Sequence, residues 1–320
     1  MRNEAVRHAP TVLILGLILA LAAPAARAWQ EEPGELPEPL ADLAPEPPWL
    51  APDPVLLGAA PTFEEQILEI VNQERWDNGQ LPPLKGQIQL DAAAELHSVN
   101  MGTRNFFGHC DLDTGTMPGQ RMTAAGYIWN SAGENIAGGQ IDPAAVMAAW
   151  MGSAGHRANI LSTGYRELGI GYHLDGGDAA NVRNDLNTDC IAESNNNGPY
   201  FRYWTQNFGL RNTVYPLVID REAHSTASQN VDLYLYGSGW AQEMRIRNSS
   251  GAFTSWMPFD PDVPWTLTAG GGEKTVIVEI RNGATVRSAS DTILLDQPLI
   301  VVFDDGFETG NTSAWSDVVP

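Results

Sequence analysis

Three histidines and one glutamate have the residue types from which a metal site or an acid–base site is built. His97 follows Glu-Leu, His109 follows Phe-Phe-Gly, Glu134 stands in Gly-Glu-Asn-Ile-Ala, and His156 follows Ser-Ala-Gly. A neutral imidazole ligates zinc through a ring nitrogen. A carboxylate serves as a ligand, as a general base, or as the acceptor that orients a histidine. Each residue taken singly also fits a purely structural role, so the argument depends on whether the fold groups them.

Other polar residues offer weaker chemistry. Ser153 precedes His156 by three residues, but no third group that would orient a serine nucleophile is evident. The run from Asp185 to Asp189 begins like a calcium loop, yet it lacks the turn glycine and the final glutamate of an EF-hand. A polar excursion between two strands is the better interpretation of this run.

The two cysteines are Cys110, directly after His109, and Cys190, in a long polar insertion. In an oxidising compartment we expect them to form a disulfide. It would close a loop of about 80 residues, which the chain-entropy model values at about 4 kcal/mol. The alternative is thiolate chemistry by Cys110, which requires a depressed pKa that a sequence does not show.

Helical periods in the first half of the chain position these residues. The run Thr62–Glu65 predicts a capping box that opens a helix. A second helix, which carries His97, is predicted from Asp91, and a third from Asp142, an N-cap followed by proline.

Strand-like runs dominate the rest of the chain. Residues 168–174 and 200–208 follow the helices, which predicts an α+β domain with an antiparallel sheet. From Val214 the helical period disappears, and short alternating runs predict an all-β, immunoglobulin-like sandwich. Since this second part holds no nucleophile–base pair, metal-spaced histidine cluster or phosphate loop, we expect it to be a spacer or an adhesion module.

Charge and the first residues restrict the partners and the compartment. The 18 Lys and Arg against 39 Asp and Glu give a net charge of −21, which excludes nucleic acid as a partner and disfavours an anionic membrane surface. Arg2 and Arg7 precede an apolar run and then Ala26-Arg-Ala28, the pattern of a secretory signal peptide. The run is shorter than the roughly 20 residues of a membrane span. We expect export to the periplasm, the cell surface or the medium, with no integral membrane span.

Six motifs follow one another in an order that points to a known family. They are Phe-Phe-x-His at 106–109, Ala-Gly-Tyr at 125–127, Gly-Glu-Asn-Ile-Ala at 133–137, Trp-Met-x-Ser-x-Gly-His-Arg-x-Asn-Ile-Leu at 150–161, Leu-Gly-Ile-Gly-Tyr at 168–172 and Trp-Thr-Gln-Asn-Phe-Gly at 204–209. Together they resemble the CAP superfamily of cysteine-rich secretory proteins, antigen 5 and pathogenesis-related proteins, and most closely its bacterial secreted branch. The resemblance runs from about Thr62 to Gly209. It implies an α-β-α sandwich with a central antiparallel sheet and a surface cleft.

The resemblance also implies a site. In the family two His and two Glu face the cleft, and a divalent metal, often zinc, sits between the two His. His109 and His156 match the paired His and Glu134 matches the first Glu, so these three are the expected metal ligands, with Zn²⁺ the one expected cofactor. The second Glu is missing, because Ser153 stands at its position. With fewer acceptors, weaker metal binding is expected.

Two further residues are candidates for the cleft. Members of the bacterial branch often have a carboxylate where this chain has Glu167, which alternatively caps a strand or pairs with Arg157. His97 faces either the cleft or the core, and the core or a structural hydrogen bond is the favoured interpretation.

These observations predict a domain map and three functions. The map has a signal peptide at 1–28, an acidic proline-rich linker at 29–61, a CAP domain at 62–212, a β-sandwich at 213–296 and an acidic aromatic tail at 297–320. The first function is a non-enzymatic extracellular binding module for a lipid-like or envelope-derived ligand or another extracellular protein. The alternatives are a zinc-dependent peptide or ester hydrolase with Glu134 as general base, and a surface-attachment protein whose histidines serve the fold.

Overall fold

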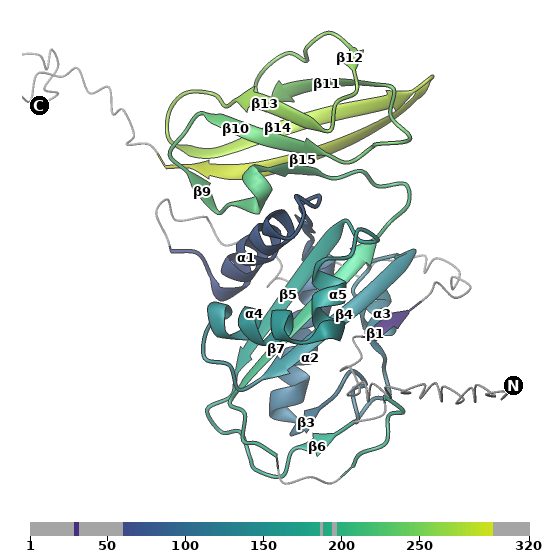
Figure 1. The fold of residues 1–320 in the computed structure, drawn as a ribbon, viewed down its shortest axis with the longest axis vertical. Helices are drawn as coiled ribbons and strands as arrows, with labels where there is room; N and C mark the ends of the chain where they lie inside the picture. The colour runs from purple at the N-terminus through teal and green to yellow at the C-terminus, as the bar shows by residue number, and fades with distance from the viewer. Residues whose placement is uncertain (1–28, 32–59, 186–187, 194–196, 297–320) are drawn as a thin grey trace, which may run out of the picture.

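The computed structural model describes residues 29–31, 60–185, 188–193 and 197–296. A domain of helices and one large sheet is followed by a β-rich region (Figure 1). The predicted signal peptide, the predicted tail and residues 32–59 of the predicted linker lie outside the described residues.

The helices of the first domain begin where local capping allows. Thr62 forms the predicted capping box, because its hydroxyl accepts from the backbone N–H of Glu65 while the Glu65 carboxylate accepts from its own N–H. Asp142 caps a later helix by accepting from the N–H of Ala145. The helix predicted from Asp91 begins three residues earlier. The helices are α1 (Phe63–Asp77), α2 (Ile88–Thr103), α3 (Pro118–Ala124), α4 (Pro143–Gly152) and α5 (Ala154–Ile160).

The central sheet has the strand order β1-β4-β7-β5-β2. Its strands are β1 (Trp29–Glu31), β2 (Lys85–Gly86), β4 (Ser131–Gly138), β5 (Glu167–Leu174) and β7 (Arg202–Leu210). Neighbouring strands are antiparallel except β2 and β5. A separate parallel pair joins β3 (Phe106–Phe107) to β6 (Arg183–Asn184). β1 corrects the sequence analysis, which assigned its residues to a linker without strand character.

Helices cover both faces of this sheet. On one face, the side chains of α1 and α4 pack with those of β5 and β7, among them Ile67, Trp150 and Trp204. On the other face α2 lies against β5, where Gly169 and Gly171 permit contact between backbones. A Cβ atom at these positions would lie 2.1 and 2.2 Å from the nearest backbone atom of α2. The predicted α-β-α arrangement of an α+β domain is therefore confirmed.

The β-rich region consists of two packed sheets. The first has the order β13-β10-β8 and the second β12-β11-β14-β15-β9. Buried side chains of both sheets, such as Leu233 of β10 and Val278 of β14, form one core, as expected of a sandwich. The strands are β8 (Leu217–Ile219), β9 (Ser225–Thr226), β10 (Asn230–Leu235), β11 (Glu243–Asn248), β12 (Met257–Pro258), β13 (Asp262–Thr266), β14 (Gly272–Asn282) and β15 (Thr285–Leu295), with a short 3-10 helix η2 (Asp220–Glu222) after β8.

Polar contacts join the β-rich region to the first domain. The Lys85 ammonium lies 2.7 Å from the Glu222 carboxylate and also contacts the carboxylate of Asp291. The Tyr236 hydroxyl donates to the carbonyl of Pro83 at 3.0 Å. The β-rich region is thus fixed to the first domain by buried contacts as well as by the chain.

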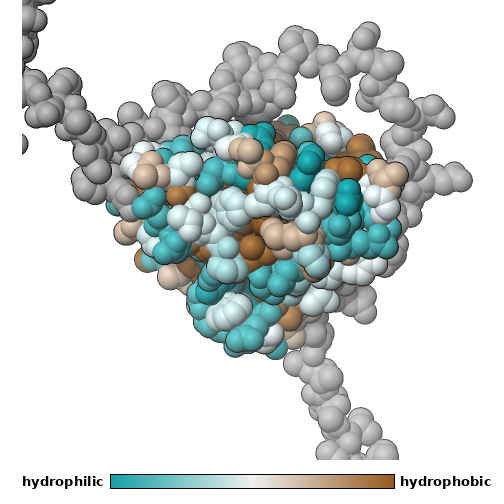
Figure 2. All heavy atoms as spheres, turned by 90° about the horizontal axis from the view of Figure 1, so that it is seen from above, coloured by the Kyte–Doolittle hydropathy of each residue, from teal (hydrophilic) through white to brown (hydrophobic). Residues whose placement is uncertain are grey.

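In the view of Figure 2, hydrophobic residues on the visible face occur in small groups between hydrophilic ones.

Candidate functional site

Glu134 of β4 is the centre of a buried polar cluster. Its side chain is fully inaccessible, and its two oxygens have different partners: Oε1 lies 2.9 Å from His109 Nδ1, and Oε2 accepts from the Arg121 guanidinium at 2.8 Å. An ionised carboxylate only accepts hydrogen bonds, so Nδ1 of His109 carries a proton. In the neutral ring the lone pair is then on Nε2, the atom that a metal or a donor of a ligand would contact.

The electrostatics keep this carboxylate charged. Burial by itself would raise the pKa of Glu134, but the charge of Arg121 and the neighbouring His97 and His109 outweigh burial and lower the pKa to about 2. Glu134 is therefore an anion at neutral pH and a weak proton acceptor.

Strand β4 directs successive side chains to opposite faces of the sheet. Glu134 faces α2, and Asn207 connects the two. When the Asn207 amide is oriented with its nitrogen toward the carboxylate, it donates to Glu134 Oε2 at 3.1 Å and accepts from the Ala94 N–H of α2 at 3.1 Å. Asn135 faces the other side, where its amide donates to the backbone carbonyl of His156 at 3.1 Å. The residues after α2 and the residues of α5 thus approach β4 from opposite faces.

His156, in α5, interacts with His109 although the two come from opposite faces. Burial and the charge of His109 lower the pKa of His156 to about 4, so its ring is neutral at neutral pH. Glu134 thus contacts the ring of His109 directly, whereas His156 is linked to His109 by this electrostatic influence and to β4 by the Asn135 hydrogen bond.

His97 lies in the core. It is fully buried, with Nε2 2.9 Å from the carbonyl oxygen of Gly108 and 3.9 Å from Glu134 Oε1. Burial, with the charge of Arg121, lowers the pKa of His97 to about 3. The ring is thus a neutral member of the wall behind Glu134.

Glu167, at the start of β5, belongs to a different cluster. It pairs with Arg211, whose Nε donates to Oε2 at 3.0 Å, and it accepts from the Tyr127 hydroxyl at 2.7 Å. Its arginine partner is Arg211 and not Arg157, and these hydrogen bonds and ion pairs do not connect it to the group around Glu134.

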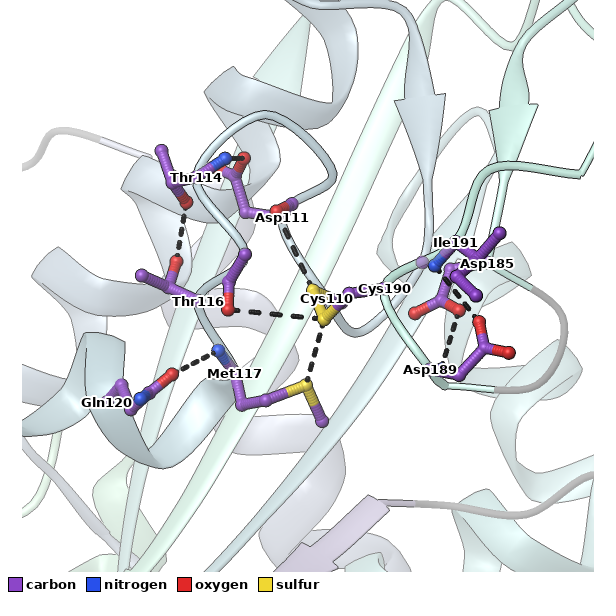
Figure 3. The surroundings of a disulfide bond; sticks show 12 residues. Cys110, Asp111, Thr114, Thr116, Met117, Gln120, Asp185, Asp189, Cys190 and Ile191 are labelled. Carbon is purple, nitrogen blue, oxygen red and sulfur yellow. Dashed lines mark hydrogen bonds between the residues drawn. A yellow bond between two sulfur atoms is a disulfide. The ribbon is translucent and has the colours of Figure 1, made fainter.

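The predicted disulfide between Cys110 and Cys190 is present, with its Cα atoms 5.3 Å apart (Figure 3). Cys190 Sγ lies 3.9 Å from the sulfur of Met117, the N-cap of the helix that carries Arg121. The bond ties the insertion between β5 and β7 to the segment that connects His109 with Arg121.

The donor set limits what the site can hold. Within the described ranges, no group of three or more His, Cys, Asp and Glu is placed to hold a metal ion. Both oxygens of Glu134 have protein partners, which favours Glu134 as the acceptor that orients His109 over Glu134 as a direct ligand. Ser153 Oγ is buried and has no hydrogen-bond partner among the residues that the structure describes, so it is not activated by His156. Of the three expected ligands, His109 and His156 then remain, fewer than the three protein ligands of an open zinc site.

Sequence reasoning missed Arg121 and Asn207, which hold Glu134 in place. An arginine in Pro-Gly-Gln-Arg gives no local sign of burial. The available signal was indirect, because a carboxylate in an otherwise apolar strand needs a cation and hydrogen-bond donors.

Two cavities lie elsewhere, where the two regions of the chain meet. One of about 540 Å³ is lined by residues of α1, η2 and β10, and one of about 200 Å³ lies beside Lys85 and Glu222. Neither includes His109 or His156 among its lining residues.

Known proteins resemble the first domain. The model of the cysteine-rich secretory protein family, CAP, matches residues 68–208. Two Bacillus subtilis proteins are similar over 110 residues, or 34% of this chain: the uncharacterised protein YkwD, 39% identical over 42% of its length, and the uncharacterised membrane protein YlbC, 34% identical over 31% of its length. The chain therefore spans less than half of either relative.

A solved structure of an extracellular protein with an SCP domain from Bacillus anthracis is 28% identical, with a TM-score of 0.36 over 47% of this chain and 40% of that one. No helix among the described residues is long and apolar enough to cross a membrane. Over residues 68–208 the chain belongs to the CAP, or cysteine-rich secretory protein, family.

Proposed function

We propose that the protein is an exported, non-enzymatic binding module whose ligand contacts the side of β4 between His109 and His156. Export rests on the signal-peptide pattern of residues 1–28 and agrees with the oxidised cysteine pair. The ligand is a partner protein or a lipid-like molecule of the cell envelope, the classes that the family resemblance implies. The β-rich region holds the binding domain from one side.

One observation carries the choice of binding over catalysis: Glu134 has no free oxygen. Its carboxylate is inaccessible and is held by His109 and Arg121. A general base must reach the proton that it removes, either directly or through one water molecule. A carboxylate that is buried behind its own hydrogen-bond partners meets neither condition, whereas a binding surface needs only the outward atoms of the two histidines.

A divalent metal is compatible with this proposal. His109 is oriented by Glu134 so that Nε2 is available, and His156 is neutral, which is the form that ligates. A bound zinc ion would supply a positive charge and an open coordination position for a ligand oxygen. Because two imidazoles would hold the metal without a protein carboxylate, we expect weak zinc binding. Ser153, at the position of the second family glutamate, supplies no negative charge that would strengthen it.

The alternative is the zinc-dependent hydrolase, and one experiment separates the two. The exported chain, His109→Ala and His156→Ala are assayed with and without zinc for hydrolysis of labelled casein and of p-nitrophenyl acetate, and for binding to fluorescent sterol and to vesicles of defined lipid composition. We expect no turnover above the protein-free rate. Saturable binding of a probe that weakens at least tenfold in His156→Ala would support the lipid version, and no saturable binding to any probe would exclude that version.

Zinc-stimulated turnover that both histidine variants abolish would overturn the proposal in favour of the hydrolase. Arg157→Ala is the matched control, because this exposed neighbour of His156 donates to a backbone carbonyl of α4, that of Met151. It should leave binding unchanged.

A further inference from the structure

Strand β4 obtains its second neighbour from a distant part of the chain. β1 pairs with it in antiparallel register, with Trp29 opposite Glu134, Gln30 opposite Gly133 and Glu31 opposite Ala132. On its other side β4 pairs with β7 over its whole length. The carbonyl oxygens of Ala132 and Glu134 also accept from the side chains of Tyr165 and Asn159, so without β1 the groups left without a partner strand would be mainly N–H donors. Figure 1 shows β1 on this side of β4, next to α3.

The segment of β4 that β1 covers is the segment that carries the candidate site. Glu134, opposite Trp29, holds His109 on one face of the sheet. The next residue, Asn135, holds the backbone of His156 on the other face. The residues that hold the two histidines are therefore neighbours in β4, and β1 pairs with β4 at one of them, Glu134.

We propose that the edge of β4 between His109 and His156 is a strand-addition site for extended polypeptide, and that Trp29–Glu31 of the same chain is its resident occupant. This inference rests on the proposed function and narrows its ligand to a peptide backbone. Adding a strand to an open edge gives affinity through main-chain hydrogen bonds and needs little sequence identity in the partner. It also requires no proton acceptor at the site.

The resident strand is short compared with the edge that it occupies. β1 pairs with three residues, whereas β4 extends over eight, from Ser131 to Gly138. The carbonyl of Ile136, the next outward one, accepts from the Trp150 indole at 3.2 Å, so a longer extended segment that displaces β1 would gain its additional main-chain hydrogen bonds from the N–H groups of β4. The predicted signal-peptide cleavage after Ala28 would make Trp29 the first residue of the exported chain, so the occupant would be a chain end that leaves the edge without moving another element.

Hydrogen exchange of the exported chain tests the resident strand. In Gln30→Pro/Glu31→Pro two successive residues lose their N–H groups. Because successive N–H groups of a strand point to opposite sides, one of the two lost groups is the one that points to β4. We expect at least one amide within residues 132–134 to exchange tenfold faster or more. The control Glu35→Pro/Leu36→Pro, placed after the end of β1, should exchange like the wild type. Unchanged exchange in the first variant would overturn the inference and leave the proposed function standing.

Peptide binding tests the ligand class. The probe is a fluorescent synthetic peptide with the sequence of residues 29–35, added to the wild type and to Gln30→Pro/Glu31→Pro. We expect saturable binding, with an affinity at least tenfold higher for Gln30→Pro/Glu31→Pro, because its β4 edge is vacated. Adding His156→Ala to this variant should lower the affinity for the peptide at least tenfold. The same peptide with proline in place of Gln30 and Glu31 should bind neither protein. Equal or absent binding of the first peptide to both proteins would refute strand addition, whereas the lipid and turnover assays above judge the binding module separately.

Discussion

Replacing Arg121 by methionine tests whether this residue fixes the charge state of the site. Arg121 and Glu134 are both buried, and the guanidinium also donates to the carbonyl of Thr116 at 2.6 Å. Removing one partner of a buried ion pair leaves an uncompensated charge and costs about 3–5 kcal/mol. We expect the free energy of unfolding of Arg121→Met, measured by urea denaturation at pH 7 with a chelator present, to fall by that amount.

The pH dependence of this loss has a predictable sign. In the wild type the pKa of Glu134 is lowered to about 2, so its stabilising contribution is present above the ordinary glutamate pKa and is lost as the pH falls towards 2. In Arg121→Met the principal cation is gone, and burial raises the pKa of Glu134 above its ordinary value. The variant is then most stable below that value and loses stability as the pH rises. The difference between the two proteins should therefore shrink from pH 7 to pH 4.

Two further variants make the result decisive. Arg121→Met/Glu134→Gln should be more stable at pH 7 than Arg121→Met alone, because no buried charge remains without a partner. Arg183→Met removes an arginine that pairs at 2.8 Å with Asp113 while both side chains are about 40% exposed, and it should cost less than about 1 kcal/mol. A loss below about 1 kcal/mol in Arg121→Met, or a loss that does not change with pH, would refute the assigned role of Arg121.

Three other changes test the framework around the site. Cys110→Ala/Cys190→Ala should lower the free energy of unfolding by about 4 kcal/mol in urea denaturation, because an 80-residue separation is no longer closed, and a loss below about 1 kcal/mol would contradict the loop-entropy argument. Gly171→Ala places a Cβ 2.2 Å from the backbone of α2 and should cost about 3 kcal/mol in the same assay, whereas Gly152→Ala, with no atom within 4 Å of the added Cβ, should be neutral or slightly stabilising. Lys85→Met leaves two buried carboxylates without their cation and should separate the unfolding of the β-rich region from that of the CAP domain in calorimetry, and a single unchanged transition would count against the junction described above.

The elements with local signals were predictable from the sequence. The capping residues Thr62 and Asp142 and the alternating runs of the β-rich region gave helix starts and strand identities that the structure confirms. β4 was not identified as a strand, because Ser-Ala-Gly-Glu-Asn-Ile-Ala-Gly lacks the alternation of a half-buried strand. It is buried on both faces, which removes the alternation, and its glycines and amides make contacts that only the tertiary structure specifies.

The sequence named residues for the candidate site but not the contacts that these residues make. Motif order identified His109, His156 and Glu134, but it gave no information on which atoms are free. The ion pair between Arg121 and Glu134 depends on how separate elements pack together. The return of β1 to the sheet from a proline-rich segment depends on backbone pairing, which leaves no side-chain signal in the sequence. Short-range sequence patterns predict which residues are candidates for the site. The contacts that form across the sheet determine which atoms of these residues are free to bind a ligand.

The charge balance of the site connects its departures from the family pattern with its proposed ligand. Glu134 is neutralised by Arg121, and the low pKa of His156 keeps that ring uncharged. A second glutamate at the position of Ser153 would add a negative charge that favours a metal cation. With serine there, the site lacks this second negative charge. A site with one carboxylate fewer attracts a divalent cation less strongly, and it lowers the electrostatic cost of placing an uncharged peptide backbone along β4. The loss of the second carboxylate and the presence of a backbone strand at the same edge therefore point to one kind of ligand, an extended chain held by hydrogen bonds.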